Sequence, residues 1–411
     1  MRISEISLLP NGELWQLEGI VESDVDPDTA EWFAPFTLWY RFPKWSGPYL
    51  SRENGDPFLA ALLPLAMQTG EPLTIAAPVS PRLLAALPDI QEIFAGFYSQ
   101  LRPIAVRAVA RQASLPSADA EPGVGLFFSL GVDSFYSLLK NVRDHPADAR
   151  TVTHLISANG FDVTYEGDDG AFPPDLLRNF HRVAEVMGKT LLPVSTNIRR
   201  VGVRLTPWPM HHGAALASVA LALGSLFRRV SIAASTTYDL LYPWGSHPVL
   251  DPLWSTETLT FVHDGCEANI TAKAAMIAES NLVLETLRPC GGHGVGHGAD
   301  YNCGRCEKCL RTMLDLLIAG KLGHCRTLPD DIDPELLRRI LRPGGRAHMA
   351  EYGRRLAALE AIGASSLLCE VLREHLSHGM APQFNERYGL AAARATPKRT
   401  LVERMLRCTR Q

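Results

Sequence analysis

The chain has 411 residues, of which 46% are hydrophobic and 20% charged, and a formal net charge of −4 with a pI near 6.4. This composition is typical of a globular protein with a substantial core, and it argues against a general attraction to nucleic acid or anionic membranes. No apolar run is long enough to cross a bilayer, and the N-terminus lacks a basic-then-apolar signal pattern. We therefore expect a cytoplasmic protein with no membrane partner.

Residues 1–115 are predicted to form a small α+β domain in which we recognise no chemistry. Two segments alternate apolar and polar residues as half-buried strands do, and Asp56 with Pro57 gives the start signal of a helix. The predicted strands are Glu13–Glu22, Phe36–Phe42 and Leu73–Ala77, and the predicted helices are Asp56–Gln68 and Pro81–Leu101, the latter interrupted at Pro88.

After a linker rich in proline and serine near residues 113–124, strands and helices alternate. The predicted strands are 126–128, 151–157, 190–195 and 230–234, with helices at 135–144, 175–187 and 213–227 between them. This order predicts an α/β fold with a doubly wound parallel sheet over residues 116–325. Helices at 334–342 and 347–375 predict a helical C-terminal region over residues 326–411.

The stretch Ser129-Leu-Gly-Val-Asp-Ser134 follows the first strand of this sheet and opens a helix. Such a turn directs backbone N–H groups and the positive end of the helix dipole at one point, which makes it an anion site and commonly a phosphate site. Gly131 lets the backbone approach a ligand, while Ser129 and Ser134 offer hydroxyl groups. Asp133 is a candidate for orienting magnesium or for capping the helix. An ordinary capped strand-to-helix turn is the alternative.

These six residues resemble the Ser-Gly-Gly-x-Asp-Ser signature of the PP-loop ATP pyrophosphatases, with Leu130 in place of the first glycine. The resemblance implies a PP-loop (HUP-like) sheet and cleavage of ATP between its α- and β-phosphates. It also implies that Ser129, Leu130, Gly131, Val132, Asp133 and Ser134 bind the nucleotide. By the same resemblance, Asn159 and the pair His211 and His212 face ATP, although a plain turn and capping histidines remain alternatives.

A loop at residues 235–257 follows the last predicted strand and is too long for a simple connection in a compact domain. Its aromatic and polar residues favour an aromatic-walled substrate pocket over a solvated linker. The residues predicted to form this pocket are Tyr238, Asp239, Tyr242, Trp244, His247 and Asp251.

Four of the eight cysteines lie close together in the sequence, at Cys290, Cys303, Cys306 and Cys309. The two overlapping C-x-x-C steps bring three thiolates round one point, and Cys290 completes a tetrahedral zinc site of the closed, structural kind. His293 or His297 could replace Cys290 as a ligand, and an iron–sulfur cluster is the alternative to zinc.

The PP-loop turn, followed downstream by Cys290, Cys303-Gly304, Cys306, Cys309 and Arg311, resembles the 7-cyano-7-deazaguanine synthases. The first 120 or so residues and the tail after about 325 have no counterpart in that family, so a divergent paralogue is expected. The resemblance implies a zinc-containing, ATP-dependent ligase with magnesium, which adenylates a carboxylate or amide oxygen for attack by ammonia or an amine. The product would be an amide or nitrile.

The sequence leaves the substrate open among a small molecule, a modified nucleobase, and a peptide or protein terminus, and it leaves a homodimer as one option for assembly. Two other functions are alternatives. One is PP-loop sulfur transfer to tRNA or a small molecule, with an iron–sulfur cluster. The other is a non-catalytic nucleotide-sensing subunit. The basic residues after 381 are more typical of a solvated helix than of an RNA contact, so nucleic acid is not the expected partner.

Overall fold

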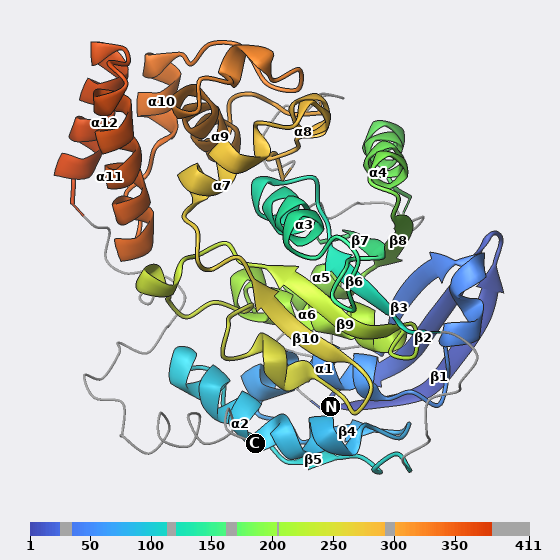
Figure 1. Ribbon diagram of the computed structural model, residues 1–411. Helices are drawn as coiled ribbons and strands as arrows, with labels where there is room; N and C mark the ends of the chain where they lie inside the picture. The colour runs from blue at the N-terminus through green and yellow to red at the C-terminus, as the bar shows by residue number, and fades with distance from the viewer. Residues whose placement is uncertain (25–34, 113–120, 162–170, 204, 292–300, 380–411) are drawn as a thin grey trace.

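The computed structural model describes residues 1–24, 35–112, 121–161, 171–203, 205–291 and 301–379. Within these ranges the strands form one ten-stranded sheet in the order β10-β9-β6-β7-β8-β3-β2-β1-β4-β5 (Figure 1). The strands are β1 (Arg2–Asn11), β2 (Leu14–Glu22), β3 (Phe36–Pro43), β4 (Leu73–Ile75), β5 (Val106–Arg107), β6 (Gly123–Phe127), β7 (His154–Asn159), β8 (Thr190–Thr196), β9 (Phe227–Ala233) and β10 (Thr260–Asp264).

Helices connect these strands and continue beyond the sheet. The α-helices are α1 (Asp56–Thr69), α2 (Pro81–Phe97), α3 (Val132–Asp144), α4 (Pro174–Val186), α5 (Ile198–Gly202), α6 (Trp208–Ala222), α7 (Ile270–Ile277), α8 (Asn281–Thr286), α9 (Glu307–Ile318), α10 (Pro334–Ile340), α11 (Arg346–Ala361) and α12 (Ser366–Ser377). Short 3-10 helices are η2 (Lys44–Tyr49), η3 (Tyr238–Leu240), η4 (Asp251–Trp254) and η5 (Leu322–His324).

The sheet is mostly parallel, which confirms the predicted α/β class. Strands β10, β9, β6, β7 and β8 pair in parallel, as βαβ connections require. β3 then joins β8 in antiparallel register, with Tyr40 opposite Thr196 and Arg41 opposite Ser195. Through this pairing the strands of residues 1–115 extend the same sheet. The division into three regions stays a prediction, and its first two regions share one layer of strands.

Side chains of the central strand β6 and the residue after it point alternately to the two faces of the sheet. Val124, Leu126 and Phe128 belong to one buried cluster, which includes residues of α3, α7 and α9, while Phe127 belongs to another, which includes residues of α1 and α6. Figure 1 shows these two groups of helices on opposite sides of the parallel strands. Burial on both faces explains why β6 reads as a continuous apolar run rather than an alternating one.

Two predicted helix boundaries are wrong. α2 runs from Pro81 to Phe97 without a break at Pro88. A proline removes one helical hydrogen bond, but the buried side chains of Leu87, Ile90 and Phe94 hold the helix on the core. The single helix predicted over 347–375 is instead two, α11 and α12, which pack against each other.

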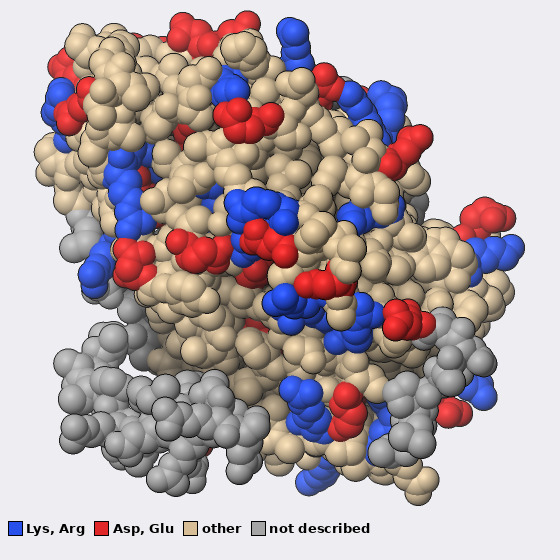
Figure 2. Space-filling model, in the orientation of Figure 1, with Lys and Arg blue, Asp and Glu red and all other residues tan. Residues whose placement is uncertain are grey.

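The surface in view carries interleaved basic and acidic side chains rather than a field of one sign (Figure 2). In the described part of the chain, no helix combines the length and apolar character needed to span a bilayer. Of the linker predicted at 113–124, residues 113–120 lie outside the described residues, and its end is wrong because β6 already begins at Gly123. The basic residues of 381–411 also lie outside the described residues.

Candidate functional site

A cleft of about 630 Å³ lies where the parallel strands β6, β7 and β9 end. Its lining includes the turn at Ser129–Ser134, the end of β7 at Asn159, and residues that follow β9. The carboxyl edge of a parallel sheet is where ligands bind in folds of this class, and the volume is typical of small-molecule sites. The turn singled out from the sequence therefore faces an open cavity.

Hydrogen bonds within the turn fix its shape. The Ser134 hydroxyl donates to the Gly131 carbonyl at 3.0 Å and accepts the Ser129 N–H at 3.2 Å, and the Gly131 N–H donates to the Ser129 hydroxyl at 3.3 Å. α3 begins at Val132, and the first helical bond runs from Phe135 N–H to Gly131 O. The N–H groups of Val132, Asp133 and Ser134 therefore precede the first N–H that has a helical acceptor, which is the arrangement that binds anions.

Leu130 has a left-handed backbone conformation, with φ at +62°, that is unusual for a residue with a side chain. Its side chain is fully buried, and its carbonyl accepts the Arg288 N–H at 2.8 Å. The turn thus adopts at Leu130 a backbone conformation that glycine, found there in the PP-loop signature, adopts without strain. Leu130 shapes the turn without lining the cleft.

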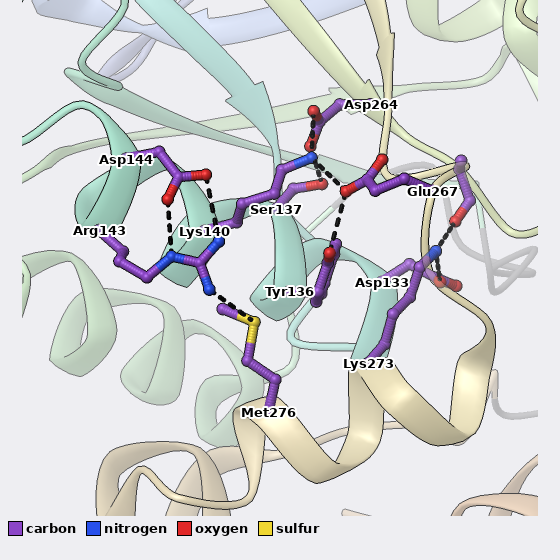
Figure 3. A network of polar contacts seen from close by, with 11 residues as sticks. Asp133, Tyr136, Ser137, Lys140, Arg143, Asp144, Asp264, Glu267, Lys273 and Met276 are labelled. Atoms are coloured by element: carbon purple, nitrogen blue, oxygen red, sulfur yellow. Dashed lines mark hydrogen bonds and ion pairs between the residues drawn. The ribbon is translucent and has the colours of Figure 1, made fainter.

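Asp133 points toward a lysine that the sequence analysis did not identify. Lys273 of α7 has only 2% of its side chain exposed, and its ammonium donates to Asp133 Oδ1 at 2.8 Å and to the Ala234 carbonyl at 2.5 Å. Figure 3 shows this contact beside a second network, in which Lys140 bridges Asp264 and Glu267 at 2.7 Å each. The carboxylate of Asp133, predicted to orient magnesium, is therefore paired with the buried ammonium group of Lys273.

The other residues predicted to face a nucleotide divide into two groups. Asn159 and His212 line the cleft, and burial lowers the pKa of His212 to about 4, so its imidazole is neutral at pH 7. His211 is buried away from the cleft, where Nδ1 lies 3.2 Å from the Pro207 carbonyl, and burial lowers its pKa to about 3. His211 therefore packs in the core, and His212 remains a candidate ligand contact.

Two of the six residues predicted to form a substrate pocket, Tyr242 and Trp244, line the cleft. They continue a row of aromatic rings with neighbouring centroids 5.2–6.2 Å apart, made of Phe161, Trp208, His212, Trp244 and Tyr242. Burial raises the pKa of Tyr242 to about 12. Tyr238 and Asp239 are exposed instead, and Asp239 forms an ion pair with Arg354.

His247 and Asp251 are buried behind the cleft wall. The Asp251 carboxylate accepts from Ser246 Oγ at 2.7 Å and from His263 Nδ1 at 2.7 Å. Burial alone would lower the pKa of His263, but the hydrogen bond to Asp251 reverses the effect and raises that pKa to about 9. Burial lowers the pKa of His247 to about 4. This loop is thus held by a buried aspartate–imidazolium pair.

The four predicted metal ligands come together. All four sulfur atoms lie within 4.8 Å of one another, with Sγ–Sγ distances of 3.6 Å for Cys290–Cys303, 3.8 Å for Cys303–Cys309 and 3.9 Å for Cys290–Cys306. Four sulfurs bound tetrahedrally to one zinc at about 2.3 Å would lie about 3.8 Å apart. The cluster therefore fits a single ion such as zinc. His293 and His297 lie outside the described residues.

The pKa values of Cys303, Cys306 and Cys309 depend on the neighbouring thiols, as expected for side chains that surround one ion site. The side chain of Cys309 donates to Cys306 and lowers the pKa of the Cys306 thiol to about 4, while that same bond raises the pKa of Cys309. Burial raises the pKa of Cys303. With protons alone, one thiolate suppresses the ionisation of its neighbours, whereas a divalent cation stabilises all of them as thiolates.

Helix α11 of the C-terminal region, for which the sequence suggests no role, contributes to the cleft. His348, Glu351, Tyr352 and Arg355 of α11 line it. Arg355 forms a fully buried, two-bond ion pair with Asp315 of α9, at 2.9 and 2.8 Å. These residues follow ordinary helical spacing, so no sequence signal distinguished them from a solvated helix face.

Three further cations of the cleft, Arg288, Lys308 and Arg311, lie close in sequence to the cysteines. Of these, the family resemblance points only to Arg311. Comparison with known proteins adds no assignment, since no family model, curated protein or solved structure matches this chain.

Proposed function

We propose that the protein is an ATP-dependent ligase-type enzyme that cleaves ATP to AMP and pyrophosphate and adenylates a carboxylate or amide oxygen for attack by ammonia or an amine. The observation that carries this proposal is the opening of the Ser129–Ser134 turn, with the N-terminus of α3, into a cleft at the carboxyl ends of parallel strands. The likeness of this turn to the PP-loop signature supports the same function.

Cleavage between the α- and β-phosphates builds negative charge on the departing pyrophosphate. The N–H groups of Val132, Asp133 and Ser134 and the dipole of α3 stabilise that charge. Magnesium bound with ATP would neutralise the phosphates, and Asp133 is the residue that would position it while Lys273 offsets the charge of the carboxylate. The aromatic row from Phe161 to Tyr242 provides flat apolar surfaces against which a purine base stacks.

The four cysteines favour this function over sulfur transfer. Their sulfur atoms are within 4.8 Å of one another, as ligands of one ion are, whereas cysteines bound to separate irons of a cluster are spread more widely. Zinc there would stabilise the fold and leave no open position for chemistry. Iron with acid-labile sulfide in anaerobically purified protein would support thiolation instead.

The experiment uses ATP labelled at the α-phosphate, with magnesium, ammonium and a set of carboxylic acids including nucleobase carboxylates. We expect labelled AMP and free pyrophosphate, and we expect Asp133→Asn to abolish both. Asp144→Asn is the matched control, because Asp144 lies on the same helix but is exposed and paired with Arg143. Labelled ADP as the product, or a wild-type protein that does not bind ATP, would overturn the proposal.

A further inference from the structure

Three cations of the cleft belong to the two segments that hold the cysteines. Arg288 precedes Cys290 by two residues, Lys308 lies between Cys306 and Cys309, and Arg311 follows Cys309 by two residues. All three line the same cleft as Ser129 and Asp133. We call residues 288–290 and 303–311 the cysteine arm. A metal bound by the four sulfurs would therefore fix the backbone from which these cations project.

The cysteine arm is attached directly to the turn. The Arg288 N–H donates to the Leu130 carbonyl at 2.8 Å. The Arg288 carbonyl lies only 3.9 Å from the position that a Cβ on Gly131 would occupy. A displacement of Arg288 would therefore move the turn, and a displacement of the turn would move Arg288.

Among the described residues, these three cations have weaker acidic partners than the other two cations of the cleft. Lys273 and Arg355, which also line the cleft, are paired with Asp133 and Asp315 at 2.8 Å. In contrast, among the described residues no carboxylate lies within 4.0 Å of Arg288 or Lys308, and Arg311 reaches Glu307 only at 4.0 Å. A cleft that keeps several unneutralised cations beside an anion-binding turn is suited to a ligand with several negative charges.

We propose that Arg288, Lys308 and Arg311 bind the β- and γ-phosphates of ATP, and the released pyrophosphate, against the Ser129–Ser134 turn. The metal held by the four cysteines positions these cations, so metal binding and polyphosphate binding strengthen each other. This inference rests on the proposed function, because it assigns the end of the nucleotide that the cysteine arm contacts. This coupling is reciprocal: bound metal raises the affinity for pyrophosphate, and bound pyrophosphate must raise the affinity for the metal by the same factor.

The first test measures the affinities of ATP, pyrophosphate and AMP by calorimetry in the full-length protein. We expect Arg288→Ala, Lys308→Ala and Arg311→Ala each to weaken ATP and pyrophosphate roughly tenfold or more, as loss of a charge-assisted hydrogen bond does, and to leave AMP binding unchanged. Arg305→Ala is the matched control, because Arg305 is an exposed cation of the same arm whose side chain does not line the cleft.

The outcomes separate this inference from the proposed function. A wild-type protein that binds no ATP would overturn both. ATP binding that is equally strong in Arg305→Ala and in the three cleft variants would overturn only the inference. Lys308 is exposed and Arg311 is 36% exposed. Their variants therefore provide the answer if the half-buried Arg288→Ala fails to fold.

The second test follows the release of zinc to a chromogenic chelator with and without pyrophosphate. We expect pyrophosphate to slow the release of zinc from the wild type and from Arg305→Ala. In the Lys308→Ala/Arg311→Ala double variant, we expect pyrophosphate not to slow it. Since pyrophosphate also chelates zinc in solution, the comparison between the two variants isolates binding in the cleft. An effect of pyrophosphate on the release rate that is the same in Arg305→Ala and in the double variant would overturn the coupling.

Discussion

Two loops reach the same cleft from neighbouring strands but are stabilised in different ways. The turn after β6 makes its shaping bonds within six residues, between Ser129, Gly131 and Ser134. The loop after β9, residues 235–257, depends on partners elsewhere in the chain. Gly245 donates to Pro209, and Asp251 accepts from His263 on β10.

The two loops thus differ in whether their shape comes from neighbouring residues in the sequence or from distant ones. The turn after β6 takes much of its form from a short sequence whose residues contact one another, so its shape, and with it the predicted anion site, is readable from that sequence. The loop after β9 places Tyr242 and Trp244 in the cleft only because distant residues pair beneath it. Variants that remove those distant partners should therefore disturb the second loop far more than the first.

The largest effect is expected for Asp251→Ala. This change leaves the buried imidazolium of His263 without its counter-charge, and breaking such a pair costs about 3–5 kcal/mol of the free energy of unfolding. Urea denaturation measures it. Asp239→Ala on the same loop breaks an exposed pair with Arg354 and should lower the free energy of unfolding far less, because solvent screens that pair. Equal losses in the two variants would show that the buried pair does not stabilise the loop.

The pH dependence of stability tests the same pair without removing it. The pKa of His263 is raised to about 9 in the folded protein, against about 6.5 when unfolded. Its stabilisation is therefore complete below pH 6.5 and is lost as the pH rises to 9, by about 1.4 kcal/mol per pH unit. Asp251→Asn should flatten this alkaline decline in urea titrations. An unchanged decline would contradict the assignment to His263.

Below pH 6.5 the free energy of unfolding changes with pH in the opposite direction, because other histidines have lowered pKa values. Burial lowers the pKa values of His211, His212 and His247 to about 3, 4 and 4. These histidines stabilise the fold above pH 6.5, and that stability is lost as the pH falls through their folded values. The free energy of unfolding should therefore be greatest near pH 6.5, between the two effects.

The turn after β6 has a long-range ion pair, between Asp133 and Lys273. The variant Lys273→Met measures how much the turn depends on this pair. The substitution leaves Asp133 and the Ala234 carbonyl without their donor, at a cost of about 1–3 kcal/mol in the free energy of unfolding. Arg143→Met is the control, because it breaks the exposed Arg143–Asp144 pair shown beside it in Figure 3 and should leave the free energy of unfolding nearly unchanged. A loss no larger than in the control would mean that the turn does not depend on the ion pair with Lys273.

Sequence reasoning predicted the parts of the molecule whose signals are local or periodic. The α/β class followed from alternating strands and helices, and the grouping of Cys290, Cys303, Cys306 and Cys309 followed from ligand spacing. It missed β1, β10 and α7, and with α7 the lysine that contacts Asp133. A single buried lysine on an apolar helix has no pattern of its own, because its partner lies 140 positions away in the chain.

The substrate-pocket prediction illustrates the same limit within one loop. Composition identified the loop at 235–257 but could not distinguish Tyr242 and Trp244, which line the cleft, from the exposed Tyr238. The contribution of α11 was equally hidden, since Glu351 and Arg355 have the spacing of any amphipathic helix. Which face of a helix or loop meets a cavity is decided by tertiary packing, which a single sequence does not encode locally.

The smallest effect concerns Leu130 and tests how far the turn is determined by its own backbone. Leu130→Ala and Leu130→Gly both lose the same buried contacts, but only glycine adopts φ near +62° without strain. We therefore expect Leu130→Gly to have the higher free energy of unfolding, by about 1 kcal/mol. The matched pair at Leu126, buried in the extended strand β6, should show the opposite order, with alanine more stable by about 0.5–1 kcal/mol. If alanine is the more stable residue at both positions, the left-handed conformation is not maintained in the variants. The turn would then owe its shape to the Leu130 side chain packed beneath it rather than to the hydrogen bonds among Ser129, Gly131 and Ser134.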